Sequence, residues 1–326
     1  MTPHSAPRDL VRAVSRAVGR EAVDAVPVGG GSICDAYAVT LDGPDTRTGT
    51  GTDARTDTGT RTSSGTGSGP ARQVFAKTLD AAPADFFAAE AAGLARLRAT
   101  GAVAVPDVYG AERGALVLEW VEPGAADAAQ AERLGRDLAA LHHTPAPSYG
   151  TPGEPCYLGP LPLTSPAAPV TDPAEWPAFH AEHRLLPFVR AAVDAGHLAP
   201  GDARAVERVC DRPDDEGVWG PPQPPAVIHG DLWAGNVHWS ADGRARLIDP
   251  AAQGGHPETD LALLDLFGTP GLRRVLAAYE EVRPVPGLAA RMPLHQLQHL
   301  LVHAVLFGGG YGARCGAAAR TALAGA

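Results

Sequence analysis

Apolar and polar residues alternate in several short runs of the first 120 residues, whereas later segments repeat apolar residues every three or four positions. Alternation is typical of half-buried strands, and the longer period is typical of amphipathic helices. The pattern predicts two strands joined by a glycine turn within 26–43, and further strands at 72–79, 103–110 and 114–122. It also predicts an N-terminal helix and a helix at 83–100.

From about residue 128 onward the pattern is mainly helical, apart from a proline-rich and irregular stretch at 145–173. The expected helices, after one at the start of this region, are 174–195, 200–211, 259–267, 270–282 and 291–307. The order of elements predicts an α+β chain with two lobes. Residues 1–121 would form a small lobe with an antiparallel sheet and one main helix. Residues 122–326 would form a larger, mostly helical lobe, joined to the first near 119–124.

Residues 44–70 interrupt this pattern, because they are almost wholly Thr, Gly, Ser, Asp and Arg. A stretch without large apolar side chains cannot bury enough surface to offset the entropy lost on ordering. We interpret it as a disordered, low-complexity expansion of a hairpin loop. A flexible lid or a phosphorylation site is the alternative.

The chain has 326 residues, is 44% hydrophobic and carries a net charge of −10 without a cluster of basic residues. This argues against nucleic acid or a membrane surface as a partner, since both reward clustered positive charge. The four cysteines are far apart and form no C-x-x-C pair, which favours a reducing, cytoplasmic location. No apolar run has the length of a signal peptide core or a membrane span.

The most informative segment is "VIHGDLWAGNVHWSADGRARLIDPA", at 227–251. It offers Asp231, then Asn236 five positions later and Asp249 a further 13 positions on. Phosphoryl transfer from ATP needs a carboxylate that accepts the proton of the attacking hydroxyl, and oxygen ligands for Mg²⁺. The Asp-x4-Asn spacing matches the catalytic loop of protein kinases, with HGD in place of HRD. The segment therefore predicts ATP and Mg²⁺ as cofactors.

Lys77 is the only lysine among 27 basic residues, and it lies at the end of a predicted strand. In a kinase-like small lobe, a lysine at this place binds the α- and β-phosphates and pairs with a helix glutamate. Glu90, on the following predicted helix, is the natural partner. A compact ammonium suits this role better than the wide guanidinium fork of arginine. Chance survival of a lysine at a strand end is the alternative.

Two further segments are expected to bind the nucleotide through backbone groups. The glycine turn allows backbone N–H groups to approach phosphates closely, although glycine runs often serve as simple turns. The segment "LEWVE" falls where the lobes should join, so its backbone would bind adenine. The residues concerned are Gly29, Gly30, Gly31 and Ser32 in the turn, and Glu119, Trp120 and Val121 in the linker.

The motifs "GGGSI", "HGDLWAGN", "LIDPA", "GGHPETDLALLDLFG", "YLGPLP" and "LLVHAVLFGGGY" resemble the fructosamine kinase, or ketosamine-3-kinase, family. The resemblance covers about residues 25–315, apart from the insert. It implies a protein-kinase-like fold of the aminoglycoside-phosphotransferase branch. It also implies ATP-dependent phosphorylation of the sugar 3-hydroxyl of ketosamines, after which the unstable 3-phosphate releases the glycated amine.

Carried over by motif, the resemblance implies that Asp231 is the catalytic base and that Asn236 and Asp249 are the Mg²⁺ ligands. Trp233 would be the sugar platform, with a core anchor as the alternative. The chain departs from the family in the 44–70 insert. It also has Ala and Gln at positions 252 and 253, where the family often has aromatic residues.

Other residues near the motifs are expected to support the site. Asp260 would accept backbone N–H bonds from the catalytic loop, and His229 would orient the same loop. His256 and Glu258 either face the substrate or hold their own loop. His295, His299 and His303 share one helix face and could bind a metal, but buried, hydrogen-bonded histidines explain them better.

Two alternatives to a ketosamine kinase remain open at this stage. A related kinase could act on an aminoglycoside, choline or another hydroxyl, or a pseudokinase could bind nucleotide without transfer. The intact set of Lys77, Asp231, Asn236 and Asp249 argues against the second. The expected partners are ATP and a glycated amine, and the chain is expected to be a monomer or a homodimer.

Overall fold

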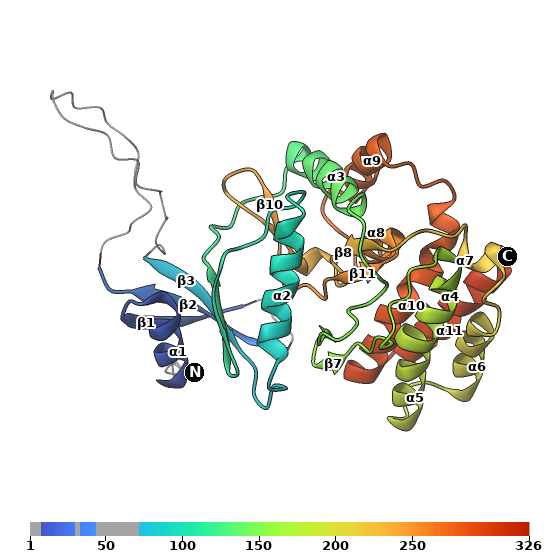
Figure 1. Cartoon of the computed structure of the whole chain (residues 1–326), viewed down its shortest axis with the longest axis horizontal. Helices are drawn as coiled ribbons and strands as arrows, with labels where there is room; N and C mark the ends of the chain where they lie inside the picture. The colour runs from blue at the N-terminus through green and yellow to red at the C-terminus, as the bar shows by residue number, and fades with distance from the viewer. Residues whose placement is uncertain (1–7, 30–32, 44–71, 326) are drawn as a thin grey trace. The chain divides into compact units, whose positions relative to one another are not determined.

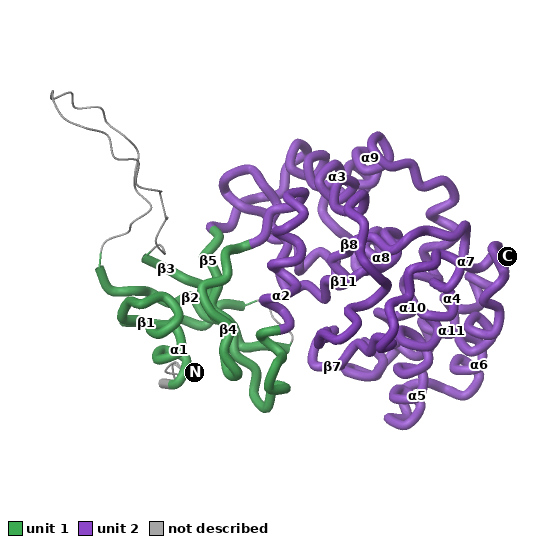
Figure 2. The backbone as a smooth tube through the Cα atoms, viewed as in Figure 1, with its two compact units in different colours: residues 1–88, 106–121 green, residues 89–105, 122–326 purple. Residues whose placement is uncertain are grey.

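The computed structural model describes residues 8–29, 33–43 and 72–325. The expectations for Gly30, Gly31, Ser32 and the 44–70 insert lie outside these residues. The chain divides into two compact units, residues 1–88 with 106–121 and residues 89–105 with 122–326 (Figure 1, Figure 2). None of the described helices is both long enough and apolar enough to cross a bilayer.

The first unit contains a five-stranded antiparallel sheet in the order β1-β2-β3-β5-β4. Its strands are β1 (Ala22–Val28), β2 (Asp35–Leu41), β3 (Gln73–Thr78), β4 (Val108–Glu112) and β5 (Ala115–Glu119). Helix α1 (Arg8–Val18) packs against this sheet and buries Leu10 and Val14 together with strand residues such as Val39 and Val74. The strands and the N-terminal helix predicted from the hydrophobic pattern are confirmed.

Strand β3 occupies the middle of the sheet, so that its residues pair on both sides. Lys77 is opposite Ala36 of β2 and Leu116 of β5. The chain then enters α2 (Phe86–Ala99), the helix predicted at 83–100. From residue 89 onward this helix belongs to the second unit, where Arg96 donates to the carbonyl oxygen of Ala252 at 2.6 Å.

The second unit is mostly helical, as predicted. Its longer helices are α3 (Ala128–His142), α5 (Leu186–Asp194), α6 (Pro200–Cys210), α8 (Pro257–Leu266), α9 (Leu272–Val282), α10 (Leu288–Phe307) and α11 (Tyr311–Ala324). Helix α3 packs on α9, and α10 packs on α8 and α11. The short α4 (Trp176–His180) continues into α5 through a π-helical turn, η2 (Ala181–Leu185).

Two short hairpin-like pairs carry the chemistry-bearing segment. Strand β8 (Ala226–Ile228) pairs with β11 (Gln253–Gly255), and β9 (Val237–Trp239) pairs with β10 (Ala245–Leu247). The hydrophobic pattern does not predict α11, the short α7 (Glu216–Trp219) or the two-residue strands β6 (Tyr157–Leu158) and β7 (Leu161–Pro162). The observed α+β architecture agrees with the predicted fold class.

Candidate active site

The candidate active site lies in the second unit, on the loop between β8 and β9. A single turn of 3₁₀-helix, η3 (Ala234–Asn236), ends this loop, and the N–H of Ile248 donates to the carbonyl oxygen of Asn236 at 3.0 Å. That bond ties the end of the loop to the chain just before Asp249. Two segments separated by a hairpin therefore meet at one place.

The three predicted catalytic and metal-binding residues of this unit come together. Nδ2 of Asn236 donates to the carbonyl oxygen of Asp231 at 2.8 Å and to its Oδ2 at 3.1 Å. The same nitrogen lies 3.5 Å from the carbonyl oxygen of Asp249. Asn236 is buried, whereas the side chain of Asp231 is 23% exposed. The site thus has a fixed amide beside a carboxylate that a substrate hydroxyl can reach.

The backbone of Asp249 adopts a left-handed conformation, with φ of 53°. This region is costly for residues other than glycine, and such strain concentrates at functional sites. A carboxylate, which Asp249 offers, and an amide oxygen, which Asn236 offers, are ligand types that Mg²⁺ prefers. Because Nδ2 of Asn236 is held on Asp231, its side-chain oxygen is directed to the other side. The residues present therefore fit a magnesium ion.

Asp260, on α8, holds the start of the catalytic loop. Its Oδ2 accepts the N–H of His229 at 2.8 Å, and its Oδ1 accepts the N–H of Gly230 at 2.9 Å. Oδ2 also lies 3.1 Å from Nε2 of His142, whose Nδ1 is 2.9 Å from the hydroxyl of Tyr279. Burial raises the pKa of Asp260, but the hydrogen bond with His142 and the electrostatic contributions of His142 and His229 together outweigh burial and lower the pKa overall.

Replacement of Asp260 by Asn is expected to destabilise the protein by about 2–4 kcal/mol, because one loop N–H or His142 loses its charged acceptor in a buried site. Urea unfolding followed by fluorescence measures this change. Asp265→Asn, at an exposed position of the same helix, is the matched control. Equal stability of the two variants would contradict the anchoring role of Asp260.

Two buried histidines brace the loop from its other sides. Nε2 of His229 donates to the carbonyl oxygen of Ile248 at 3.0 Å, and its Nδ1 accepts the N–H of Asp231 at 3.3 Å. His299, on α10, donates from Nε2 to the carbonyl oxygen of Gly230 at 3.0 Å, and the same atom lies 3.8 Å from Oδ1 of Asp231. Both nitrogens of His229 are thus occupied, so it is suited to orienting the loop.

Trp233 lies in the middle of the loop and is partly exposed. Its ring packs against Gly235, where an added Cβ would come within 2.3 Å of the indole. Phe267 meets the indole edge to face, with 6.1 Å between ring centroids, and His303 lies 4.9 Å beyond Phe267. His303 in turn contacts Tyr311 at 5.0 Å. Aromatic rings from the "DLFG" and "FGGGY" segments therefore support the position of Trp233.

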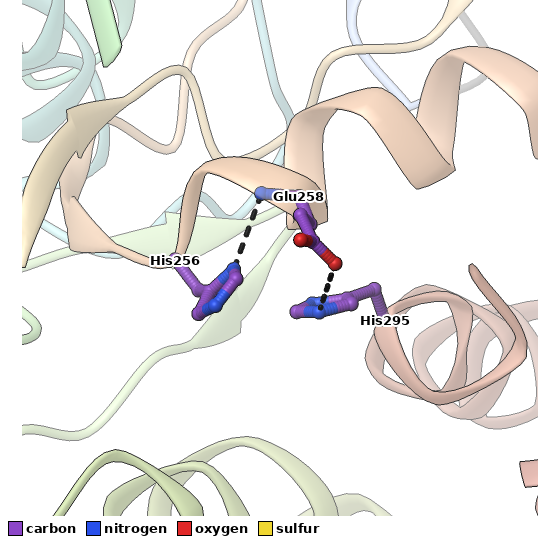
Figure 3. Close-up of side chains that lie close together, drawn as sticks. All are labelled: His256, Glu258 and His295. Carbon is purple, nitrogen blue, oxygen red and sulfur yellow. Dashed lines mark hydrogen bonds and ion pairs between the residues drawn. The ribbon is translucent and has the colours of Figure 1, made fainter. Parts of the chain in front are cut away.

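His256 and Glu258 belong to a buried polar cluster with His295 (Figure 3). Nδ1 of His256 accepts the N–H of Glu258 at 3.2 Å and thereby caps α8, while Nε2 of His295 lies 3.4 Å from Glu258. Arg291 binds both carboxylate oxygens of Glu258, at 2.8 Å and 2.6 Å.

Two imidazoles and a carboxylate could form a metal site. However, the Arg291 guanidinium already neutralises the Glu258 carboxylate. The structure therefore favours the loop-holding interpretation of His256 and Glu258. Their direct contact with substrate stays a prediction.

The predicted nucleotide-binding residues lie mainly in the first unit. Lys77 is 4% exposed in β3, and Gly29 follows β1. Glu90 lies on α2 in the part assigned to the second unit, so its pairing with Lys77 stays a prediction. The N–H of Glu119 donates to the carbonyl oxygen of Asp107 at 2.8 Å, within the sheet. Adenine recognition would therefore fall to the other backbone groups of 119–121.

Several residues of the site were not found from the sequence. His142, Tyr279 and Arg291 are remote from the motifs in sequence and reach them only through the fold. His299 was assigned a buried, hydrogen-bonded role, and the structure agrees, but its partner on the catalytic loop was not foreseen. Phe267 had a signal, since it lies within the quoted "GGHPETDLALLDLFG" motif.

Stability should fall as the pH falls from about 7 to 4, because buried histidines stay neutral in the folded state. Burial lowers the pKa of His299 from its usual 6.5 to about 4, and it also lowers the pKa of His180, His229 and His256. The unfolded chain takes up these protons first, so unfolding gains protons below pH 6.5. Each histidine contributes about 1.4 kcal/mol per pH unit to the slope of the free energy of unfolding against pH.

Urea unfolding at pH 5, 6 and 7 tests this dependence. His299→Gln is expected to reduce the dependence of the free energy of unfolding on pH. The reduction should correspond to about one proton fewer taken up on unfolding, since one of the contributing groups is removed. A free energy of unfolding that does not change over this range would contradict the neutral state of these histidines.

The profile of the fructosamine kinase family matches residues 52–324. A relative from Thermus thermophilus, described as a probable ketoamine kinase, is 40% identical over 72% of this chain and 82% of its own length. A chloroplastic protein-ribulosamine 3-kinase from Oryza sativa is 30% identical over 74% of this chain and 70% of its own.

Comparison with solved structures leads to the same family and fold. A protein of Thermobifida fusca, provisionally assigned as a fructosamine-3-kinase, is 42% identical, with a TM-score of 0.79 and coverage of 97% of this chain and 98% of the other. Macrolide 2′-phosphotransferase type I is 18% identical with a TM-score of 0.56 over 95% of each chain, which shows a shared fold. The predicted protein-kinase-like fold is thereby confirmed.

Proposed function

Because this chain belongs to the fructosamine kinase family, we propose that it transfers the γ-phosphoryl group of ATP to the 3-hydroxyl of a ketosamine. The single observation that carries the proposal is the junction of Asp231 and Asn236 beside Asp249, within the family's motifs. Relatives described as ketoamine and ribulosamine kinases support the substrate class. The products would be ADP and a ketosamine 3-phosphate, and breakdown of the latter would free the amine.

Asp231 is the proposed base for the attacking hydroxyl. Asn236 donates to Oδ2 of Asp231, and Nε2 of His299 lies 3.8 Å from Oδ1, so both oxygens have fixed surroundings. The backbone of the loop is fixed in turn by Asp260. A carboxylate positioned in this way accepts the hydroxyl proton as the new P–O bond forms.

The phosphates of ATP would be held by the first unit and by a metal ion. Asn236 and Asp249 are the proposed Mg²⁺ ligands, and the ion supplies neutralisation of charge on the phosphates when it is bound. Lys77 would bind the α- and β-phosphates through its ammonium group, with Glu90 as its ion-pair partner. The backbone N–H groups of Gly29 and its neighbours would cap the phosphates.

Trp233 is the proposed platform for the sugar. An aromatic face stacks on the C–H face of a sugar without demanding one pattern of hydroxyl groups. The edge contact with Phe267 and the close fit to Gly235 fix the indole on the catalytic loop, two residues after Asp231 in the sequence. We also infer a cytoplasmic location, because none of the four cysteines forms a disulfide.

An assay of ATP consumption against a panel of ribulosamines, fructosamines, aminoglycosides and choline tests the proposal. We expect turnover of one or both ketosamines, with far less activity on the other two classes. Turnover of aminoglycosides or choline alone would assign the chain to a different hydroxyl kinase. Nucleotide binding without any turnover would identify a pseudokinase and contradict the proposal.

A further inference from the structure

A small polar cavity lies inside the second unit, lined by residues of the helical run 176–194, by β8, β11 and α10. The centre of a water-sized sphere can move within a volume of about 10 Å³ in this cavity. This volume leaves room for one water molecule or one monoatomic ion. Gly230, the residue before Asp231, forms part of its wall. The cavity is therefore directly behind the catalytic loop.

Arg184 lines this cavity and is buried, with 2% of its surface exposed. Its Nε and Nη2 donate to Oε1 of Gln253, and its Nη1 donates to the carbonyl oxygens of Thr164 and His183, at 2.6 Å and 2.9 Å. All of these acceptors are neutral. Among the described residues, one N–H of Nη2 has no acceptor. The ring of Phe179 lies 4.8 Å from the guanidinium carbon.

The charge of Arg184 is not balanced by a carboxylate. Within the described part of the chain, no ion pair joins it to Asp or Glu, and burial lowers its pKa to about 10. A buried cation without an anion beside it is costly, since its desolvation is not repaid. Glu258 is near in the sequence to the cavity wall, but Arg291 binds both of its oxygens.

Other polar groups line the same space. Nε2 of His180 is buried and has no hydrogen-bond partner among the described residues. Nδ1 of His256 accepts the N–H of Glu258, so the neutral ring carries its proton on Nε2. The amide of Gln298, which is 3% exposed, also lines the cavity. The wall contains no acidic side chain.

The backbone places Arg184 in an unusual way. The helical run 176–194 is interrupted by the π-helical turn η2, which contains Arg184 and begins just after His180. Such turns are rare, often occur at functional sites, and change the direction of the side chains that follow. The side chains of His180 and Arg184, four positions apart, thus both line the cavity.

We propose that this cavity binds one small monoatomic anion, with chloride as the natural ligand. A cation is disfavoured because Arg184 forms part of the wall. Water is disfavoured because it is neutral and would leave the buried charge of Arg184 uncompensated. Phosphate and sulfate exceed the available room. Halide binding is measured without ATP or a ketosamine, so its outcome is separate from that of the proposed phosphoryl transfer.

Bromide replaces chloride and can be located by anomalous diffraction. Crystals of the full chain grown in sodium gluconate and soaked in sodium bromide should show a bromine peak within hydrogen-bond distance of the Arg184 guanidinium. Water density at this place, or bromine peaks confined to the surface, would overturn the proposal.

The melting temperature gives a second readout in solution. At constant ionic strength, replacing gluconate with chloride or bromide should raise it by about 2–4 °C, because the ion binds the folded state alone. Arg184→Gln should abolish this rise in melting temperature. Gln298→Leu keeps the charge of the cavity and should weaken halide affinity about tenfold.

Arg190→Gln is the matched control, since Arg190 is exposed on the same helical run and its replacement changes the charge equally. It should retain the full halide increment. If Arg184→Gln does not fold, the halide affinity of Gln298→Leu tests the proposal in its place. A halide increment that is equal in Gln298→Leu, Arg190→Gln and the unmodified chain would place the ion elsewhere and contradict the proposal.

Discussion

Asp231→Asn is expected to lower kcat by about 10³-fold or more while ATP still binds with its original affinity. The amide keeps the size of the carboxylate, but it cannot accept the proton of the attacking hydroxyl, and general-base catalysis of this kind contributes about 10²–10⁴-fold. A fall in kcat with unchanged KM for ATP indicates the loss of an interaction made in the transition state. Steady-state kinetics with a ketosamine and calorimetry with ATP measure the two effects.

Asp194→Asn provides the comparison, because Asp194 is exposed at the end of α5 and the charge change is the same. Its kcat should equal that of the unmodified chain. If Asp231→Asn retained nearly the full rate, another group would have to accept the proton. The assignment built on the 227–251 segment would then be wrong.

Lys77→Arg is expected to lower kcat/KM for ATP by about 10²-fold, even though the charge is kept. The guanidinium is wider than the ammonium and spreads its charge over a planar fork. At a buried position in the middle of a sheet, with 4% of the residue exposed, there is little room for it to adjust. Phosphate positioning depends on a compact cation at this place.

Lys77→Met removes the charge of the side chain but keeps an unbranched chain of similar length, so it shows the effect of the charge alone. It should lose at least as much activity as Lys77→Arg, and nucleotide titrations should show weaker binding in both variants. Full activity of Lys77→Arg would mean that any cation suffices at this strand. The sole lysine of the chain would then be a chance survivor of a composition rich in arginine.

Local periodicity predicted most elements of the fold. The alternation in "RQVFAKTL" predicted β3, and the apolar spacing at 83–100 predicted α2. Helix α11 was missed because residues 311–324 are rich in Ala and Gly and contain few large apolar residues. The π-helical turn at 181–185 was also missed, since no simple period distinguishes it from an α-helix.

The core of the site could be predicted because its residues lie in one segment of 25 positions. The contact between Asn236 and Asp231 bridges five positions, and a turn of 3₁₀-helix is enough to make it. The contact between His142 and Asp260 bridges 118 positions. Contacts of that kind depend on how α3 and α8 pack, which local patterns do not encode.

The polar cluster around Glu258 shows a similar limit. The sequence left open whether His256 and Glu258 face the substrate, because both follow Asp249 closely. Arg291, 33 positions after Glu258, forms a buried ion pair with it, which favours the loop-holding interpretation. A neutralised, buried carboxylate is suited to holding the start of α8.

The central claim is that Lys77, Asp231, Asn236 and Asp249 act on one nucleotide. A crystal structure with Mg²⁺, a non-hydrolysable ATP analogue and a ketosamine tests it most directly. We predict that Nζ of Lys77 lies within hydrogen-bond distance of the α- or β-phosphate, that Asn236 and Asp249 ligate the metal, and that the 3-hydroxyl lies beside Asp231. A nucleotide bound with Lys77 remote from its phosphates would contradict the account.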